Sequence, residues 1–277
     1  MLAIDVQSAA RSAGYEVIAW NRAELDITDR EAVCRVIAAA APDVVVNCAA
    51  YTAVDAAEGE GRGAAAEINE LGAGNVAEAT SAAEAWLMHV STDYVFDGTK
   101  MTGPYVESDP PAPASVYGAT KLAGEAAVAR WAPASHTIVR TSWLFANHGA
   151  CFPATILGLA AQRDQLSVVD DQRGCPTYTP DLASALLDLA GTRRRMLGVV
   201  HLAGGGECSW FEFAQAILQR AGVHTSLRPC ASEDFPRPAL RPAYSVLRTE
   251  RGEKVPVLRD WRQSVREYLD LRGLATA

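Results

Sequence analysis

Three short and almost uninterrupted apolar runs constrain the fold of this chain more than any other feature. They occupy residues 43–48 (D-V-V-V-N-C), 86–91 (W-L-M-H-V-S) and 136–141 (H-T-I-V-R-T), and stretches with helical character separate them. A strand that is apolar throughout is buried on both faces, and parallel strands need a long crossover between them. The pattern therefore predicts an α/β fold built on a doubly wound parallel sheet.

The flanking elements are predicted from helix and strand signals. A helix at residues 2–13 ends at Gly14, and a strand follows at 16–20. Thr28 and Glu31 have the spacing of a capping box, which predicts the start of a helix that stops before Pro42. Further helices are expected at 63–83, 116–130, 151–162, 180–191 and 209–221, and a further strand at 199–204.

Polar residues follow three of the predicted strands at the point where each strand ends. They lie in residues 47–52 (N-C-A-A-Y-T), 91–93 (S-T-D) and 140–143 (R-T-S-W). Each segment alone is typical of an ordinary strand end. Ligands of open α/β sheets, however, bind beyond the carboxyl ends of the strands. The three segments are therefore predicted to converge on one crevice.

Tyr117 and Lys121 lie four residues apart in the predicted helix at 116–130. At this spacing both side chains lie on one helix face, so their polar ends can meet one reactant. A solvated helix face is the alternative interpretation. A free tyrosine has a pKa of about 10, and a nearby ammonium group favours the phenolate. We therefore expect Lys121 to lower the pKa of Tyr117 and to make it a better proton donor.

Composition and charge exclude several classes of function. The chain has 277 residues and a formal net charge of −8 without a basic stripe, which disfavours a nucleic-acid partner. The six cysteines form no C-x-x-C pair and the five histidines lack metal-ligand spacing, so we expect free thiols, a reducing compartment and no metal ligands. No apolar segment reaches eighteen residues, which predicts a cytoplasmic protein without a membrane partner.

Five sequence blocks carry a resemblance to a known family. They are S-T-D-Y-V-F-D-G at 91–98, Y-G-A-T-K-L-A-G-E at 117–125, R-T-S-W at 140–143, D-D-Q-R-G-C-P-T at 170–177 and R-P-A-Y-S at 241–245. From about Gly14 to Trp261 the chain resembles the extended short-chain dehydrogenase/reductases, specifically the dTDP-4-dehydrorhamnose reductases. The resemblance implies a Rossmann-like dinucleotide-binding domain at 1–147 and a mainly substrate-binding domain at 148–277, with about 178–204 returning to the Rossmann sheet.

The resemblance also implies roles for the residues of the crevice. Tyr117 would donate a proton to the oxygen at C4 of a keto sugar while the nicotinamide delivers hydride to the carbon. Lys121 would bind the nicotinamide ribose, and Thr92 would hold the carbonyl oxygen in line with Tyr117. The expected substrate-binding residues are Asp93, Tyr94, Trp143 and Arg241, although Trp143 also fits a core aromatic residue and Arg241 a solvated loop residue.

The cofactor is predicted from the end of the strand at 16–20. A carboxylate at this place would bind the adenosine 2′-hydroxyl and repel a 2′-phosphate. The chain has Asn21 and Arg22 instead, which favours NADPH and leaves NADH possible. By resemblance, Asp26 and Ile27 contact the adenine side, Asn69 braces the site, and the residues along the dinucleotide are Ala49, Ala50 and Thr52.

The chain departs from the family pattern at its N-terminus. The resembling proteins open with a strand and a turn of the type T-G-x-x-G-x-x-G, whereas this sequence begins within the helix that follows. We therefore expect the Rossmann domain to be N-terminally truncated, with its first strand missing from this chain, and the natural start to lie upstream. A chain of 277 residues is expected to bind dinucleotide weakly. An intact mass of the natural protein equal to that of residues 1–277 would refute the upstream start.

Three functions follow from these observations. The leading one is NADPH-dependent reduction of the 4-keto group of dTDP-4-dehydro-β-L-rhamnose to dTDP-β-L-rhamnose. The second is reduction of another dTDP-4-keto-deoxysugar, such as a streptose-type or antibiotic sugar. The third is a non-catalytic regulatory subunit of the same fold. A monomer or homodimer is expected, and the metal requirement stays open.

Overall fold

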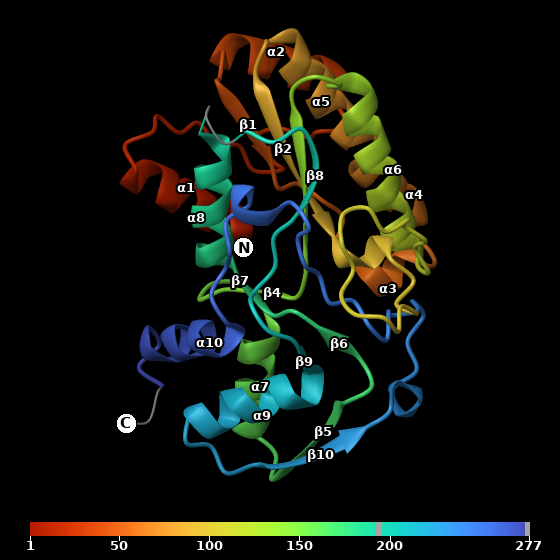
Figure 1. Cartoon of the computed structure of the whole chain (residues 1–277), viewed down its shortest axis with the longest axis vertical. Helices are drawn as coiled ribbons and strands as arrows, with labels where there is room; N and C mark the ends of the chain where they lie inside the picture. The colour runs from red at the N-terminus through yellow and green to blue at the C-terminus, as the bar shows by residue number, and fades with distance from the viewer. Residues whose placement is uncertain (192–194, 275–277) are drawn as a thin grey trace.

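A parallel sheet of four strands, in the order β1-β2-β3-β8, forms the centre of the computed structural model, which describes residues 1–191 and 195–274. Its strands are β1 (Val44–Asn47), β2 (Trp86–Thr92), β3 (His136–Thr141) and β8 (Gly198–His201), and every pairing among them is parallel. Helices cover both faces of the sheet (Figure 1). The prediction of a Rossmann-like α/β fold is confirmed.

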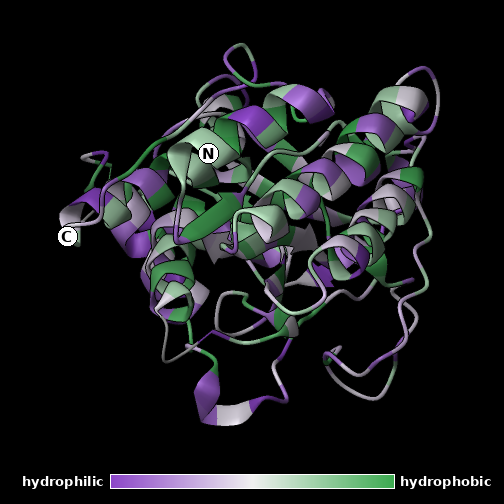
Figure 2. Cartoon of the chain, turned by 90° about the horizontal axis from the view of Figure 1, so that it is seen from above, coloured by the Kyte–Doolittle hydropathy of each residue, from purple (hydrophilic) through white to green (hydrophobic). Residues whose placement is uncertain are grey.

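The two faces of the sheet carry different helices. On one face pack α1 (Leu2–Ser12) and α8 (Thr179–Ala190), and on the other α2 (Arg30–Ala40), α5 (Ala73–Ala82) and α6 (Val116–Trp131). Successive strand residues point to opposite faces, so in β2 Leu87 packs with the second group and Met88 with the first. In Figure 2 hydrophobic and hydrophilic segments alternate along the helices around the sheet, as expected of elements with one buried side.

A smaller layer lies below the sheet in Figure 1. It contains α7 (Phe152–Ala160), α9 (Trp210–Arg220) and α10 (Trp261–Asp270), and the parallel pair β5 (Gln165–Val169) and β10 (Ser226–Cys230). Its core contains Phe213 and Trp261. The short helices are α3 (Val54–Ala57), α4 (Arg62–Ala66) and the π-helical η1 (Glu67–Gly72). The 3₁₀ turns are η2 (Asp93–Val95), η3 (Ser232–Asp234) and η4 (Gly252–Lys254). Two pairs of two-residue strands complete the fold: β4 (Leu144–Phe145) with β7 (Thr177–Tyr178), and β6 (Arg173–Gly174) with β9 (Cys208–Ser209). None of the helices in the described part of the chain is long and apolar enough to cross a membrane.

Two local predictions are wrong. Residues 16–20 form no strand, because a strand exists only through backbone pairing and no described residue pairs with this segment; Ile18 and Trp20 are exposed. The capping box at Thr28 and Glu31 is also absent. Asp29 caps α2 by accepting a hydrogen bond from the Ala32 amide at 3.0 Å, because the Thr28 hydroxyl instead donates to Asp26.

Two glycines let α6 pack at backbone distance from its neighbours. A Cβ atom at Gly118 would lie 2.1 Å from the Tyr94 carbonyl oxygen, and one at Gly124 would lie 2.1 Å from the Asn69 carbonyl oxygen. No side chain fits at either place without a backbone shift. The glycines of Y-G-A-T-K-L-A-G-E therefore fix how closely α6 approaches η2 and η1.

A buried ion pair also holds α6 against the sheet. The Arg140 guanidinium on β3 donates two hydrogen bonds to Glu125 on α6, at 2.9 and 2.7 Å, and the Ser91 hydroxyl on β2 donates to the same carboxylate at 2.5 Å. All three residues are buried. Because a charge in a dry interior needs its partner, this contact ties one helix to two strands.

Gly118→Ala is expected to lower the free energy of unfolding by about 1–3 kcal/mol, because the new methyl group overpacks the contact with Tyr94. The matched control is Gly63→Ala in α4, where a Cβ atom meets nothing within 4 Å. The control should raise stability by about 0.5–1 kcal/mol, since alanine has the higher helix propensity. Urea denaturation measures both. Equal stabilisation by the two substitutions would contradict the packing described for α6.

Candidate active site

Tyr117 and Lys121 lie on the buried face of α6 that is turned to the carboxyl end of β2. Ser115 caps this helix by accepting a hydrogen bond from the Gly118 amide at 3.1 Å, so Tyr117 stands in the first turn. Lys121 follows one turn later, and its ammonium donates to the Val90 carbonyl oxygen at 2.7 Å. Only 2% of Lys121 is exposed, so this face is not a solvated one.

The phenol of Tyr117 meets residues that follow β2. The Thr92 hydroxyl interacts with the Tyr117 hydroxyl and favours its phenolate form. The Tyr94 ring packs edge-on against the Tyr117 ring, with centroids 5.6 Å apart and an interplanar angle of 76°. The single proton of the Thr92 hydroxyl can go either to Tyr117 or to the Asp93 carboxylate, 3.1 Å away. The structure thus brings together Thr92, Asp93, Tyr94 and Tyr117.

The prediction that Lys121 lowers the pKa of Tyr117 is wrong. Burial raises the pKa of Tyr117 to about 12, with a smaller opposing effect of the Thr92 hydroxyl and a further rise caused by Asp93. Burial likewise lowers the pKa of Lys121 to about 8, opposed by Glu125 and Cys48. The Lys121 ammonium contacts Val90 and, at 3.5 Å, His89, a residue that the sequence analysis did not single out.

Asp93 is a buried carboxyl group at the same place. Burial raises its pKa to about 6, and the hydroxyls of Ser245 and Thr92 oppose this rise only in part. Its Oδ2 atom is buried and has no hydrogen-bond partner among the described residues. A buried acceptor without a partner is costly unless another group binds it. Asp93 is therefore suited to a hydroxyl group of a ligand.

Arg241 joins this group from the C-terminal part of the chain. Its guanidinium is bidentate on Asp55, at 3.0 and 2.8 Å, and also donates to the Ala239 carbonyl oxygen at 3.0 Å. Burial raises the pKa of Tyr94, and the nearby positive charge of Arg241 opposes this rise. Asp55 was missed by the sequence analysis, and no local signal connects it with an arginine 186 positions later.

Trp143 lies in another cluster. Its indole stacks on Trp210 with ring centroids 3.5 Å apart, and a Cβ atom at Gly174 would lie 2.4 Å from it. Its backbone has a φ of +46°, a strained conformation for a residue with a side chain. No hydrogen bond or ring contact within residues 1–191 and 195–274 joins Trp143 to Tyr117.

The expected cofactor residues lie on two segments. Ala49, Ala50 and Thr52 follow β1, and Asn69 braces this segment by accepting from the Tyr51 amide at 2.8 Å and donating to Thr120 on α6 at 3.0 Å. The second segment precedes α2. There Arg22 and Asp26 are exposed, with the pKa of Asp26 lowered mainly by hydrogen bonds from Thr28, and Ile27 packs on Gly72.

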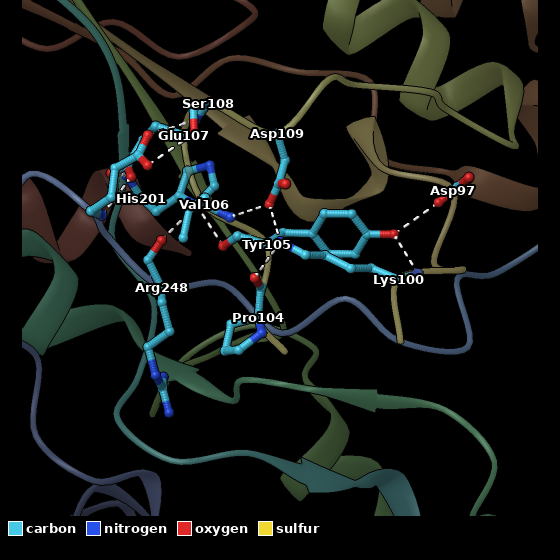
Figure 3. Close-up of polar contacts among 11 residues, drawn as sticks. Asp97, Lys100, Pro104, Tyr105, Val106, Glu107, Ser108, Asp109, His201 and Arg248 are labelled. Atoms are coloured by element: carbon cyan, nitrogen blue, oxygen red, sulfur yellow. Dashed lines mark hydrogen bonds and ion pairs between the residues drawn. The ribbon is translucent and has the colours of Figure 1, made fainter. Parts of the chain in front are cut away.

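The loop between η2 and α6 is pinned by the polar contacts in Figure 3. The Tyr105 hydroxyl donates to Asp97 at 2.8 Å, and Lys100 binds Asp109 at 2.5 Å. Glu107 accepts from the His201 amide at 2.8 Å, which ties the loop to the end of β8. These contacts join parts of the loop to one another and fix the loop to the end of β8.

Comparison with known proteins places the chain among nucleotide-sugar enzymes. The pattern of the family described as RmlD substrate binding domain matches residues 1–273. A dTDP-4-dehydrorhamnose reductase of Mycolicibacterium smegmatis is 43% identical over 265 residues, which cover 94% of this chain and 79% of that protein. A probable dTDP-4,6-dihydroxy-2-methyloxan-3-one 4-ketoreductase of Streptomyces antibioticus is 41% identical, with 91% and 85% covered.

The fold comparison agrees. The crystal structure of dTDP-4-dehydrorhamnose reductase from Bacillus anthracis in complex with NADP superposes with a TM-score of 0.92 at 36% identity, covering 98% of this chain and 95% of that one. The family pattern and these similarities extend over nearly the whole chain. The chain therefore belongs to the family described as RmlD substrate binding domain, together with the dTDP-4-dehydrorhamnose reductases to which it is similar.

Proposed function

We propose that this chain catalyses the NADPH-dependent reduction of the 4-keto group of dTDP-4-dehydro-β-L-rhamnose, which gives dTDP-β-L-rhamnose. The observation that carries the proposal is the meeting of the Tyr117 phenol with the Thr92 hydroxyl, one helical turn before the buried Lys121 ammonium. The similarity to reductases named for this reaction supports the choice of substrate.

In this proposal a side chain of the protein supplies the proton that the reaction consumes. NADPH, when bound, supplies a hydride to the carbonyl carbon. The Thr92 hydroxyl holds the ketone oxygen next to Tyr117, which donates its proton to that oxygen. The pKa of Tyr117, raised to about 12, keeps the phenol protonated at neutral pH, which is the form that can donate, but makes it a weaker acid than a free tyrosine. Lys121, one helical turn further along α6, would bind the nicotinamide ribose next to this phenol.

The residues present fit a dinucleotide. The segment after β1 has small side chains at Ala49 and Ala50, which leave the backbone accessible. Leu2 at the start of α1 belongs to the same core cluster as Cys48, so the N-terminal, positive end of this helix dipole lies near that segment. Arg22, Asp26 and Ile27 would bind the adenosine half, and Thr52 would contact the dinucleotide together with Ala49 and Ala50. The exposed cation at Arg22 favours NADPH over NADH, which stays possible.

On the substrate side, we assign the sugar to Asp93, Tyr94 and Trp143 and the diphosphate to Arg241. A guanidinium can bind two phosphate oxygens at once, and Arg241 stands beside Tyr94. Arg241 is bidentate on Asp55, and a diphosphate would compete with this carboxylate for the guanidinium. Residues 1–147 would then bind the dinucleotide and 148–277 mainly the sugar nucleotide, with residues 198–201 pairing in the sheet.

Two alternatives keep the same fold. The similarity to the 4-ketoreductase of Streptomyces antibioticus favours a reductase of another dTDP-4-keto-deoxysugar, and comparison of kcat/KM across such sugars would separate the two. A non-catalytic regulatory subunit would lack turnover altogether. We further propose a cytoplasmic monomer or homodimer without a nucleic-acid partner, with support from six free cysteines and the net charge of −8.

Tyr117→Phe should lower kcat by a factor of about 10²–10⁴, because it removes the general acid while keeping the ring. NADPH oxidation at 340 nm with the keto sugar nucleotide measures the rate. Tyr268→Phe is the matched control, since Tyr268 is a fully buried tyrosine in the core around Phe213. Turnover that survives in Tyr117→Phe would exclude the proposed role. No turnover in a wild-type chain extended upstream of Met1 to its natural start would favour a regulatory subunit.

Arg241→Ala should raise KM for the sugar nucleotide by roughly ten- to hundredfold and change kcat less, because a charged contact to the diphosphate is lost. Arg237→Ala is the control: Arg237 is 59% exposed and reaches Asp55 only at 3.5 Å. Its KM should stay within about twofold of the wild type, as is usual for an exposed ion pair. Equal KM values for the two variants would count against the assignment of Arg241.

A further inference from the structure

A chain of three buried polar side chains leads from β1 through β2 to α6. Asn47 and His89 are neighbours in the parallel register of β1 and β2, and the Asn47 Nδ2 atom lies 3.2 Å from the His89 Nδ1 atom. The other ring nitrogen, His89 Nε2, lies 3.5 Å from the Lys121 Nζ atom. Asn47, His89 and Lys121 are 5%, 1% and 2% exposed, so water does not compete for these contacts.

The orientation of the Asn47 amide follows from its second contact. The Asn47 Oδ1 atom accepts a hydrogen bond from the Ala49 backbone amide at 3.0 Å. Rotation of the side-chain amide by 180° would place its NH₂ group against the Ala49 N–H, so that two donors would face each other. The NH₂ group must therefore point at His89 Nδ1 and donate to it.

The tautomer of His89 follows in turn. A ring nitrogen that accepts a hydrogen bond carries no proton, so Nδ1 is the acceptor and the neutral imidazole carries its proton on Nε2. That N–H points at Lys121 Nζ. An ammonium group has donors only and cannot accept this hydrogen bond, whereas a neutral amine can.

We propose that Asn47 and His89 are positioning residues that fix the Nε2–H tautomer of the imidazole and thereby favour the neutral amine form of Lys121. In the proposed reaction they act through Lys121, which is the group that the His89 ring contacts. His89 lies in the middle of β2, a largely buried strand, and has no role in the function proposed above.

The other charged and titratable groups around Lys121 oppose this effect or leave it unchanged. Glu125 on α6 and Cys48 after β1 favour the ammonium form, while burial favours the amine. His89 itself stays neutral, because burial, Lys121 and His136 on β3 all lower its pKa well below the usual value. A charged imidazole next to Lys121 is therefore excluded near neutral pH.

The consequence concerns proton exchange at the active site. If the proposed reductase function holds, the Tyr117 phenolate formed in each turnover must regain a proton. A lysine that titrates near neutral pH exchanges its proton with a neighbour more readily than one that titrates near 10.4, the ordinary value. The role in proton exchange rests on the proposed function. The tautomer of His89 and the titration of Lys121 can be measured on the protein without substrate or cofactor.

The tautomer is tested by ¹⁵N NMR of the histidine rings, because protonated and unprotonated ring nitrogens have well separated shifts. The His89 signals are assigned by their loss in His89→Gln. At pH 7 we expect a neutral ring with its proton on Nε2. A ring with its proton on Nδ1, or a doubly protonated ring, would overturn the proposal.

The effect on Lys121 is tested by titration of ¹³Cε-labelled lysine, which is simple because the chain has lysines only at 100, 121 and 254. The Lys121 signal, assigned by its loss in Lys121→Arg, should titrate with a pKa of about 8. His89→Gln places a carbonyl oxygen where the N–H stood, and Asn47→Asp draws the ring proton to Nδ1. Each should raise the midpoint by about one pH unit, a tenfold gain in proton affinity.

His136→Gln is the control, since His136 is a buried histidine on the neighbouring strand that contacts the Ala132 carbonyl oxygen and not Lys121. In His136→Gln the pH midpoint of the Lys121 titration should equal that of the wild type. In Asn47→Asp the ¹⁵N spectrum must also change to the Nδ1–H form, which separates the tautomer effect from the added charge. A Lys121 midpoint that is the same in the wild type, His89→Gln and Asn47→Asp would contradict the proposal.

Discussion

The hydrogen bond from the Lys121 ammonium to the Val90 carbonyl oxygen is the interaction on which the site depends. A buried polar group needs a hydrogen-bond partner, so this contact fixes where α6 lies along β2. Tyr117, one turn earlier, then has to meet Thr92 at the end of the same strand. The glycines at 118 and 124 and the buried pair of Arg140 with Glu125 hold the helix at the required distance.

Burial rather than a single ion pair sets the acid–base properties of this site. It raises the pKa of Tyr117 to about 12 and of Asp93 to about 6, and it lowers that of Lys121 to about 8. In all three groups burial shifts the pKa toward the neutral form of the side chain. A ligand that brings charge into this crevice will find partners that change protonation easily, which suits proton transfer to a ketone.

The sequence predicted the sheet and the core of the site because both depend on local patterns. Apolar runs mark β1, β2 and β3, and the four-residue spacing puts Tyr117 and Lys121 on one helix face. Contacts between distant segments were not predictable in this way. Asp55 meets Arg241 only after the chain has folded, and His89 looks like a core residue of β2 until Asn47 and Lys121 stand beside it. The strand expected at 16–20 failed because its apolar pattern says nothing about a pairing neighbour.

The most direct test of the central claim, that this crevice reduces a ketone at C4 of a nucleotide sugar, is isotope transfer from the cofactor. The protein is incubated with dTDP-4-dehydro-β-L-rhamnose and NADPH that carries two deuterium atoms at C4 of the nicotinamide, and the product is examined by mass spectrometry and NMR. The account predicts dTDP-rhamnose with one deuterium atom, located at C4 of the sugar. Product without deuterium, or deuterium at another carbon, would contradict it.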